Sequence, residues 1–205
     1  MKFILNPLRN YSSLGAGTIA SYGKPGDRIR FYEINPNVIE LSLGAERVFT
    51  YLADSAADVT VASGDARLTL EHELMESGAQ NFDVLAIDAF SSDAIPVHLL
   101  TEEAIELYLK HLKSKDGILA IHITNNHLDL KPLVSALANR FKLASVWIED
   151  YGMDDMTLEN EWILLSQNSN TLDALGIAES ASPLSTDHLF RIWTDDYSNL
   201  YRLLK

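Results

Sequence analysis

The stretch "FDVLAIDAFSSDAIPVHLLTEEA" (residues 82–104) decides the fold. Its apolar run at 84–87 lacks any alternation with polar residues, which is typical of a strand covered on both faces of a sheet. After a short polar loop, Thr101 suits a helix N-cap, and Glu102 and Glu103 are favourable in a first helical turn. A buried strand that leads through a loop into a helix indicates one half of a βαβ unit.

The same alternation continues on both sides of this stretch. Strands are expected at 28–34, 58–63, 82–88, 117–124, 143–149 and 161–167, and helices at 36–52, 66–77, 101–113 and 130–141. The last two strands have no helix between them and predict an antiparallel edge hairpin. We therefore predict an α/β, doubly wound, Rossmann-like fold with a mostly parallel seven-stranded sheet.

The two ends of the chain give weaker patterns. The first strand falls in the polar segment "PLRNYSSLG" (7–15), so either the strand is short or the chain is clipped just upstream of it. The segment at 194–205 predicts a short helix or an ordered tail.

The composition of the chain narrows the classes of protein to which it can belong. The chain has 205 residues, 47% of them apolar, and no cysteine, which suits one domain over 1–205 without disulfides or thiolate metal sites. A formal charge of −13 argues against nucleic-acid binding and permits a cationic ligand, although acidity also serves solubility. The sequence shows neither a membrane span nor a secretory signal, so we expect a soluble, cytoplasmic protein.

Several polar or glycine residues fall where strands should end, and ligands of open parallel sheets bind at that edge. Gly15 and Gly17 would let the backbone approach a ligand, but a bare turn explains them equally well. Glu33 ends the second strand, where a carboxylate can accept ribose hydroxyls. Asp65 ends the third strand, where it can meet an adenine edge, cap the next helix, or do both.

Two aspartates lie at and after the end of the strand expected at 82–88. Asp88 ends it, beside the first strand in the doubly wound order, and should face the reacting end of a ligand; Asp93 lies on the loop behind, where an ordinary loop acid is the alternative. The histidines are expected to be structural or polar-loop residues, with His98 packed under the following helix. His122 and His127 lack the spacing of a helical metal pair, and no metal is implied.

Four segments resemble a known family. They are "LGAGTIASYGKPGDRIRFYEINPNVIE", "SGDARLTL", "FDVLAIDAFSSDAIPVHLLTEEA" and "TDDYSNL". From about residue 14 to the C-terminus the chain resembles the spermidine synthase-like polyamine aminopropyltransferases, within the superfamily of S-adenosylmethionine-dependent methyltransferase folds. It is similar in particular to bacterial proteins in which this domain is fused behind membrane helices.

The resemblance implies roles for individual residues. Glu33 would hold the ribose, and the pair Asp65 and Ala66 would meet the adenine. Asp88 would act on the attacking amine, with Asp93 helping to hold the polyamine. A late tyrosine also orients the amine in that family, and Tyr151 is the match in this sequence.

The implied activity is transfer of an aminopropyl group from decarboxylated S-adenosylmethionine to a small cationic amine such as putrescine, a step of polyamine biosynthesis. We expect the chain to depart from the family in three places. Ala16 replaces an aspartate in the loop of Gly15 and Gly17 (the glycine loop), the loop after Asp88 is longer, and the N-terminal β-domain is expected to be missing. A methyltransferase that uses S-adenosylmethionine, a non-catalytic nucleoside- or polyamine-binding domain and, more distantly, a dehydrogenase stay open, as does a homodimer.

Overall fold

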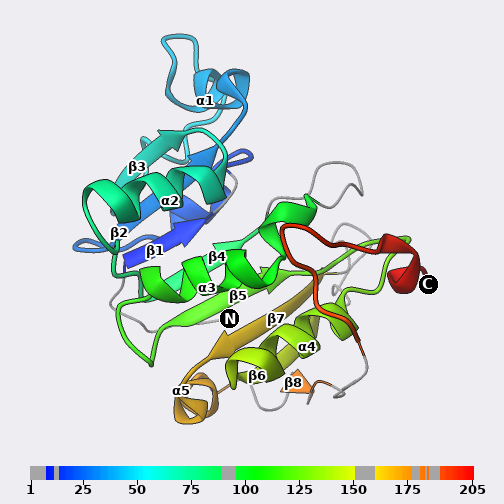
Figure 1. Ribbon diagram of the computed structural model, residues 1–205. Helices are drawn as coiled ribbons and strands as arrows, with labels where there is room; N and C mark the ends of the chain where they lie inside the picture. Colours follow the sequence, from blue (N-terminus) through cyan, green and yellow to red (C-terminus); the bar gives the residue numbers. More distant parts are fainter. Residues whose placement is uncertain are drawn as a thin grey trace.

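The computed structural model describes residues 8–11, 14–88, 96–150, 160–176, 181–182, 184 and 190–205, with only the backbone described at 8–11, 150 and 181. Within these ranges, eight strands form one sheet in the order β3-β2-β1-β4-β5-β7-β6-β8 (Figure 1). The strands are β1 (Leu8–Tyr11), β2 (Arg28–Glu33), β3 (Asp58–Ser63), β4 (Val84–Ile87), β5 (Ile118–His122), β6 (Ala144–Asp150), β7 (Asn160–Ser166) and β8 (Ala181–Ser182).

The sheet is parallel from β3 to β5 and antiparallel beyond. The predicted hairpin is β6 and β7, of which β7 inserts between β5 and β6. The predicted number of seven strands is wrong, because the two-residue β8 extends the sheet past β6. A strand this short carries no hydrophobic period by which the sequence could reveal it.

Helices cover both faces of the sheet. They are α1 (Pro36–Leu43), α2 (Ala66–Glu76), α3 (Glu102–His111), α4 (Lys131–Phe141) and α5 (Ser169–Ala174), with the 3₁₀ turns η1 (Thr18–Tyr22), η2 (Val97–Leu99) and η3 (Leu200–Leu203). In Figure 1, α2, α3 and α4 lie on the near face. On β4, Leu85 and Ile87 belong to the core under these helices, whereas Ala86 packs in a second core with Leu172 of α5. This alternation of faces confirms that β4 is covered on both sides.

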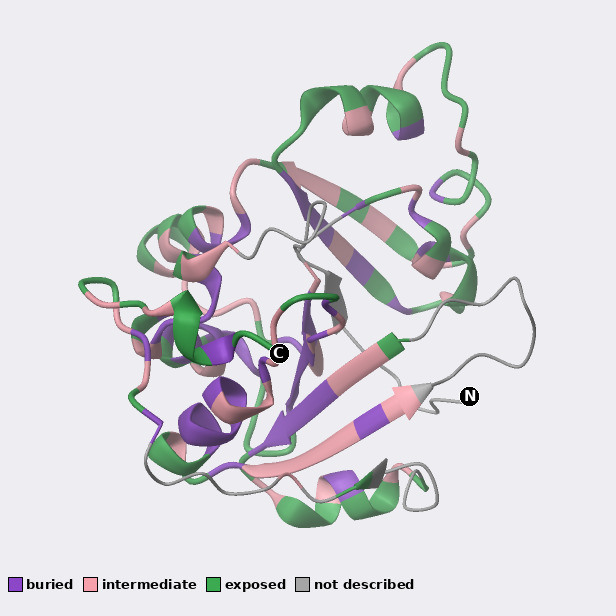
Figure 2. Cartoon of the chain, turned by 90° about the vertical axis from the view of Figure 1, so that its right-hand side faces the viewer, coloured by how far each residue is buried: buried purple, intermediate pink, exposed green. Residues whose placement is uncertain are grey.

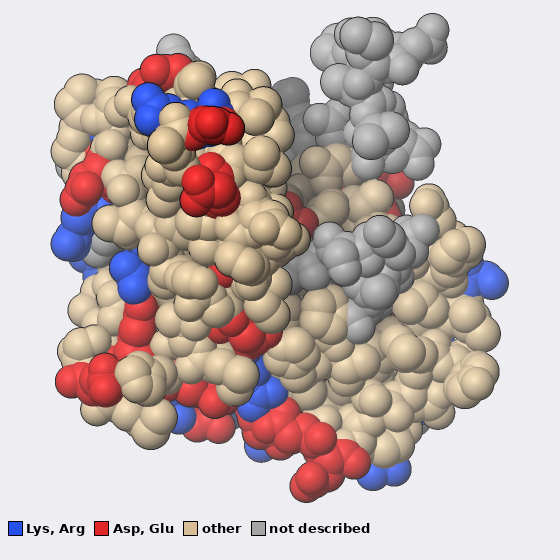
Figure 3. Space-filling view, turned by 90° about the horizontal axis from the view of Figure 1, so that it is seen from above, with Lys and Arg blue, Asp and Glu red and all other residues tan. Residues whose placement is uncertain are grey.

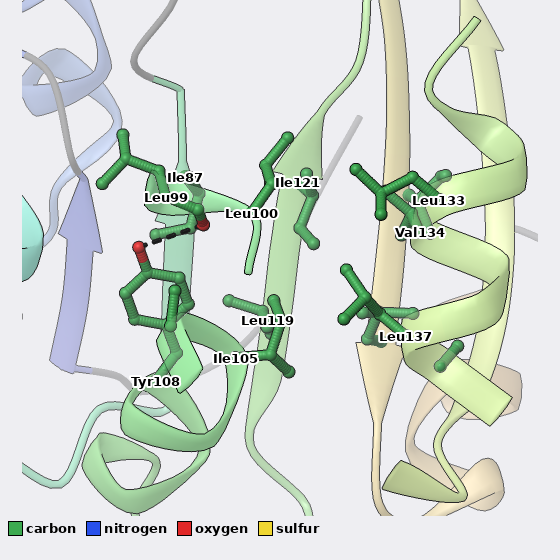
Figure 4. Packing of buried hydrophobic residues seen from close by; sticks show 14 of the residues in the cluster. Ile87, Leu99, Leu100, Ile105, Tyr108, Leu119, Ile121, Leu133, Val134 and Leu137 are labelled. Carbon is green, nitrogen blue, oxygen red and sulfur yellow. Dashed lines mark hydrogen bonds between the residues drawn. The ribbon is translucent and has the colours of Figure 1, made fainter. Parts of the chain in front are cut away.

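The main core lies between α3, α4 and the central strands. Figure 4 shows Ile105 of α3 and Leu137 of α4 directed at Leu119 and Ile121 of β5, and all four side chains are fully buried. In Figure 2 the purple, buried segments accordingly run through the middle of the sheet and along the inner sides of the helices. Together these contacts fix β4 and β5, at whose carboxyl ends Asp88 and His122 lie.

Three local predictions are refined by the structure. The first strand is short but present, since β1 pairs with both β2 and β4. The helix predicted over 36–52 ends at Leu43, because the chain turns at Gly44 and then folds back so that Val48 and Phe49 donate backbone hydrogen bonds to the Leu41 carbonyl. The C-terminal segment forms η3 after an extended stretch, within the predicted alternatives.

Candidate functional site

The carboxyl ends of β1 to β4 lie at one edge of the sheet, because these strands are parallel neighbours. β1 has β2 on one side and β4 on the other, so the strand order reverses there and creates the crevice in which open α/β sheets bind ligands. The glycine loop follows β1, Glu33 ends β2, Asp65 follows β3 and Asp88 follows β4. The structure therefore brings these predicted site residues to the same edge.

The glycine loop needs its glycines for two different reasons. Both Gly15 (φ 51°) and Gly17 (φ 79°) adopt the left-handed conformation, which disfavours other residues. A methyl group on Gly17 would stand 2.1 Å from Cδ1 of Leu52, so this position is also closed by packing. A methyl group on Gly15 would meet nothing within 4 Å, which leaves the backbone there open.

Glu33 ties the end of β2 to the glycine loop. Its buried carboxylate accepts a hydrogen bond from the backbone N–H of Leu14 at 3.1 Å through Oε2, and another from Asn35 at 2.8 Å through Oε1. Each carboxylate oxygen has more than one lone pair, so these bonds leave acceptor capacity for a hydroxyl group. Glu33 thus fixes the shape of the loop from the position predicted for ribose binding.

Asp65 performs the helix-capping role that the sequence suggested. Its Oδ1 accepts from the backbone N–H of Leu68 at 3.0 Å, and α2 begins at the buried Ala66. Oδ2 lies 2.9 Å from Nε2 of His98, whose side chain is half-exposed. The expectation that His98 packs under the following helix is wrong, because its ring turns outward to reach the Asp65 carboxylate instead.

Asp88 also has an unexpected histidine partner. Its Oδ1 lies 2.7 Å from Nδ1 of His122, the last residue of β5, and the His122 ring stacks on Trp162 of β7 at 4.8 Å between ring centres. The prediction of a structural or polar-loop role for His122 did not include this contact. The strand register explains this contact. Ile87 of β4 lies opposite Ile121 of β5, so the residues that follow them, Asp88 and His122, lie side by side.

A cleft of about 930 Å³ opens at the Asp65 end of this edge. Its walls include Ile34 and Leu68, two apolar side chains that are 68% and 63% exposed, together with His98 and Tyr197. The hydrophobic spacing of α2 groups Leu68 with Leu70 and Leu74 near one side of the helix, but Leu68 points into the cleft. The volume of the cleft falls within the range of small-molecule sites, and its exposed apolar walls suit a flat ring.

The wall of this cleft depends on Arg67, a residue that the sequence analysis did not single out. The buried guanidinium donates to both carboxylate oxygens of Asp195 (2.7 and 2.6 Å), to Thr101 Oγ1 (3.1 Å) and to the His98 carbonyl (2.8 Å). These bonds join α2, the start of α3 and the C-terminal segment. The guanidinium also lowers the pKa of the Asp195 carboxyl below its ordinary value.

Acidic side chains dominate the charge around the molecule. In Figure 3 they form more of the coloured surface than Lys and Arg do, and they gather along the lower border of the view. Asp93 and Tyr151, the two predicted amine-binding residues, lie outside the described residues. Within the described ranges, no group of three or more His, Asp or Glu side chains is arranged to hold a metal ion, and no helix has the length and apolar character needed to cross a membrane.

Comparison with known sequences finds a curated relative. No protein-family model matches the chain. A polyamine aminopropyltransferase of Vibrio vulnificus (strain CMCP6) is 31% identical over 109 residues, which make up 52% of this chain and 34% of that protein. The match thus spans about a third of the length of this curated relative.

Solved structures share the fold over nearly the whole chain. A probable spermidine synthase from Corynebacterium glutamicum ATCC 13032 superposes with a TM-score of 0.63 at 21% identity, covering 94% of this chain and 74% of that one. A spermidine synthase in complex with the transition state analogue AdoDATO gives 0.58 at 15% identity, and the spermidine synthase from Thermotoga maritima gives 0.56 at 14%, each covering 93% of this chain and 63% of the other. The resemblance predicted from the sequence is thus confirmed, and the fold is that of the spermidine synthases.

Proposed function

We propose that the chain carries the catalytic domain of a spermidine synthase-like aminopropyltransferase, which moves an aminopropyl group from decarboxylated S-adenosylmethionine to a small diamine such as putrescine. The observation that carries this proposal is Asp88, at the carboxyl end of β4 beside the switch in strand order, within a fold shared with spermidine synthases. The sequence likeness to a polyamine aminopropyltransferase supports the same reaction.

The residues at the edge suit a nucleoside co-substrate. The open backbone at Gly15 and the remaining acceptor capacity of Glu33 fit a sugar, and the exposed apolar pair Ile34 and Leu68 fits a base. Asp65, between these groups, supplies a carboxylate at the mouth of the cleft. We assign the cofactor contacts to Gly15, Gly17, Glu33, and the pair Asp65 and Ala66, with Asp88 at the reacting end.

Carboxylates offset the electrostatic repulsion between the two cations of this reaction. A protonated amine must approach a cationic sulfonium, and two unit charges 4 Å apart repel by ~1 kcal/mol in water and ~4 kcal/mol at an effective dielectric of 20. Asp88 offsets this repulsion and takes the proton from the ammonium group. The neutral nitrogen then forms the new C–N bond while the C–S bond breaks, so that the sulfonium becomes a neutral thioether. We assign Asp93 and Tyr151 to the amine as well.

A direct assay tests the proposal. The purified chain is incubated with putrescine and decarboxylated S-adenosylmethionine, or with S-adenosylmethionine in parallel, and spermidine and 5′-methylthioadenosine are measured by mass spectrometry. We expect spermidine only with the decarboxylated compound. Transfer of a methyl group from S-adenosylmethionine, or absence of binding of both compounds in calorimetry, would contradict it.

Substitutions test which aspartates take part in the reaction. Asp88→Asn should lower kcat by about 100-fold or more, because the amide cannot accept the proton, and Asp93→Asn should mainly raise KM for the amine. Asp83→Asn is the matched control: Asp83 sits near the opposite end of the same strand and pairs with Lys113 at 3.2 Å. Full turnover by Asp88→Asn would remove Asp88 from the reaction.

A further inference from the structure

The contact between Asp88 and His122 has the geometry of a hydrogen bond. The two atoms are 2.7 Å apart, which is the distance of a charge-assisted hydrogen bond. An ionised carboxylate can only accept, so Nδ1 of the imidazole must carry the proton. A proton-accepting Asp88 thus requires the direction in which His122 donates from Nδ1 to Oδ1.

The imidazole is itself held in place. His122 ends β5, where its backbone pairs with Trp162 of β7, and its ring stacks on the indole with an angle of 27° between the ring planes. The His122 side chain is only 20% exposed, compared with 45% for Asp88. The more buried, ring-stacked partner thus holds the more exposed carboxylate.

We infer that His122 is a positioning residue, which holds the Asp88 carboxylate in the orientation that receives the proton of the attacking amine. This inference rests on the proposed function. A carboxylate at the surface can rotate freely, whereas acid–base catalysis needs its oxygen within hydrogen-bond reach of the reacting nitrogen. The Nδ1–H bond selects one orientation of the carboxylate.

Two substitutions separate the hydrogen bond from simple packing. In His122→Asn the amide nitrogen can stand near the position of Nδ1 and donate to Asp88, whereas His122→Leu has no donor. Both variants lose the stack on Trp162, so a difference between them reports the hydrogen bond. His127→Leu is the matched control, because His127 is an exposed histidine five residues further along the chain.

Steady-state kinetics with putrescine as acceptor give the first readout. His122→Leu should lower kcat by about 100-fold with KM for the amine little changed, as expected when a catalytic group is misplaced by about 1 Å. His122→Asn should recover most of the lost kcat, and His127→Leu should match the wild type. Equal losses in the two His122 variants, or unchanged kcat in His122→Leu, would overturn the inference.

Nitrogen-15 NMR of the imidazole rings gives a second readout that needs no turnover. We expect Nδ1 of His122 to be protonated in the wild type, and its resonance to shift in Asp88→Ala. A neutral ring protonated only at Nε2 would overturn the inference even in an active enzyme. A wild type that transfers no aminopropyl group but shows the Nδ1 proton would instead contradict the proposed function while leaving the hydrogen-bonded pair intact.

Discussion

At the scale of single residues, Gly15 and Gly17 share a loop and a left-handed backbone but differ in their surroundings. We expect Gly17→Ala to destabilise the fold by roughly 3 kcal/mol, because left-handed strain adds to the clash with Leu52. Gly15→Ala should cost only about 1 kcal/mol, because its methyl group enters open space. Urea denaturation measures both values.

The same pair of variants tests the site. The proposed nucleoside contact at Gly15 predicts that calorimetric titration of Gly15→Ala shows weaker binding of 5′-methylthioadenosine even though the fold is nearly intact. Affinity equal to that of the wild type would mean that no ligand passes close to this backbone. Equal stability losses in the two variants would contradict the packing argument at Leu52.

Glu33 offers a second test at this scale, because both of its oxygens accept backbone N–H groups. In Glu33→Gln one acceptor becomes an NH₂ group facing a donor, so a buried N–H loses its partner. We expect a loss of about 1–3 kcal/mol in the free energy of unfolding. Glu40→Gln, the same change on the exposed side of α1, should stay within about 0.5 kcal/mol of the wild type. If the two variants unfold at the same urea concentration, the Glu33 bonds contribute nothing to the fold.

At the scale of elements, the bond between Arg67 and Asp195 joins α2 to the C-terminal segment. The Arg67 guanidinium lowers the pKa of Asp195 below its ordinary value of 3.8. A carboxyl whose pKa falls on folding stabilises the fold above its unfolded pKa, and this contribution is lost as the pH falls through the folded value. Stability from this contact should therefore be complete above about pH 5 and disappear below pH 3.8.

Urea denaturation from pH 7 to pH 2.5 measures this contribution as the difference between wild type and Asp195→Asn. We expect about 1 kcal/mol at pH 7, a modest value because the Asp195 side chain is 45% exposed. The difference should shrink in the most acidic samples. Asp196→Asn, at the exposed neighbouring position, should follow the wild type throughout. A difference that stays constant to pH 2.5 would show that the ion pair does not shift the titration of Asp195.

The elements themselves were largely predictable, whereas the partners of their side chains were not. β4 and α3 follow from a continuous apolar run and a capped amphipathic pattern, and both were confirmed. α1 was predicted too long, since hydrophobic spacing persists after Gly44 where the chain folds back on Leu41. The partners of Asp65 and Asp88 were missed, because they depend on how η2 packs beside Asp65 and on which strand lies next to β4. Local periodicity encodes neither.

At the scale of the whole molecule, the formal charge of −13 should act on any cationic ligand. The protein's field concentrates cations near its surface, and salt screens this effect, since the Debye length falls from about 10 Å at 0.1 M to about 3 Å at 1 M. We expect calorimetry to show that putrescine binds markedly more weakly as NaCl rises over this range. The neutral nucleoside 5′-methylthioadenosine is the matched control, and its affinity should change little because it carries no charge for the field to attract. Equal salt dependence for both ligands would mean that the acidic surface does not select the amine, and selection would then rest on the carboxylates at the carboxyl edge of the sheet alone.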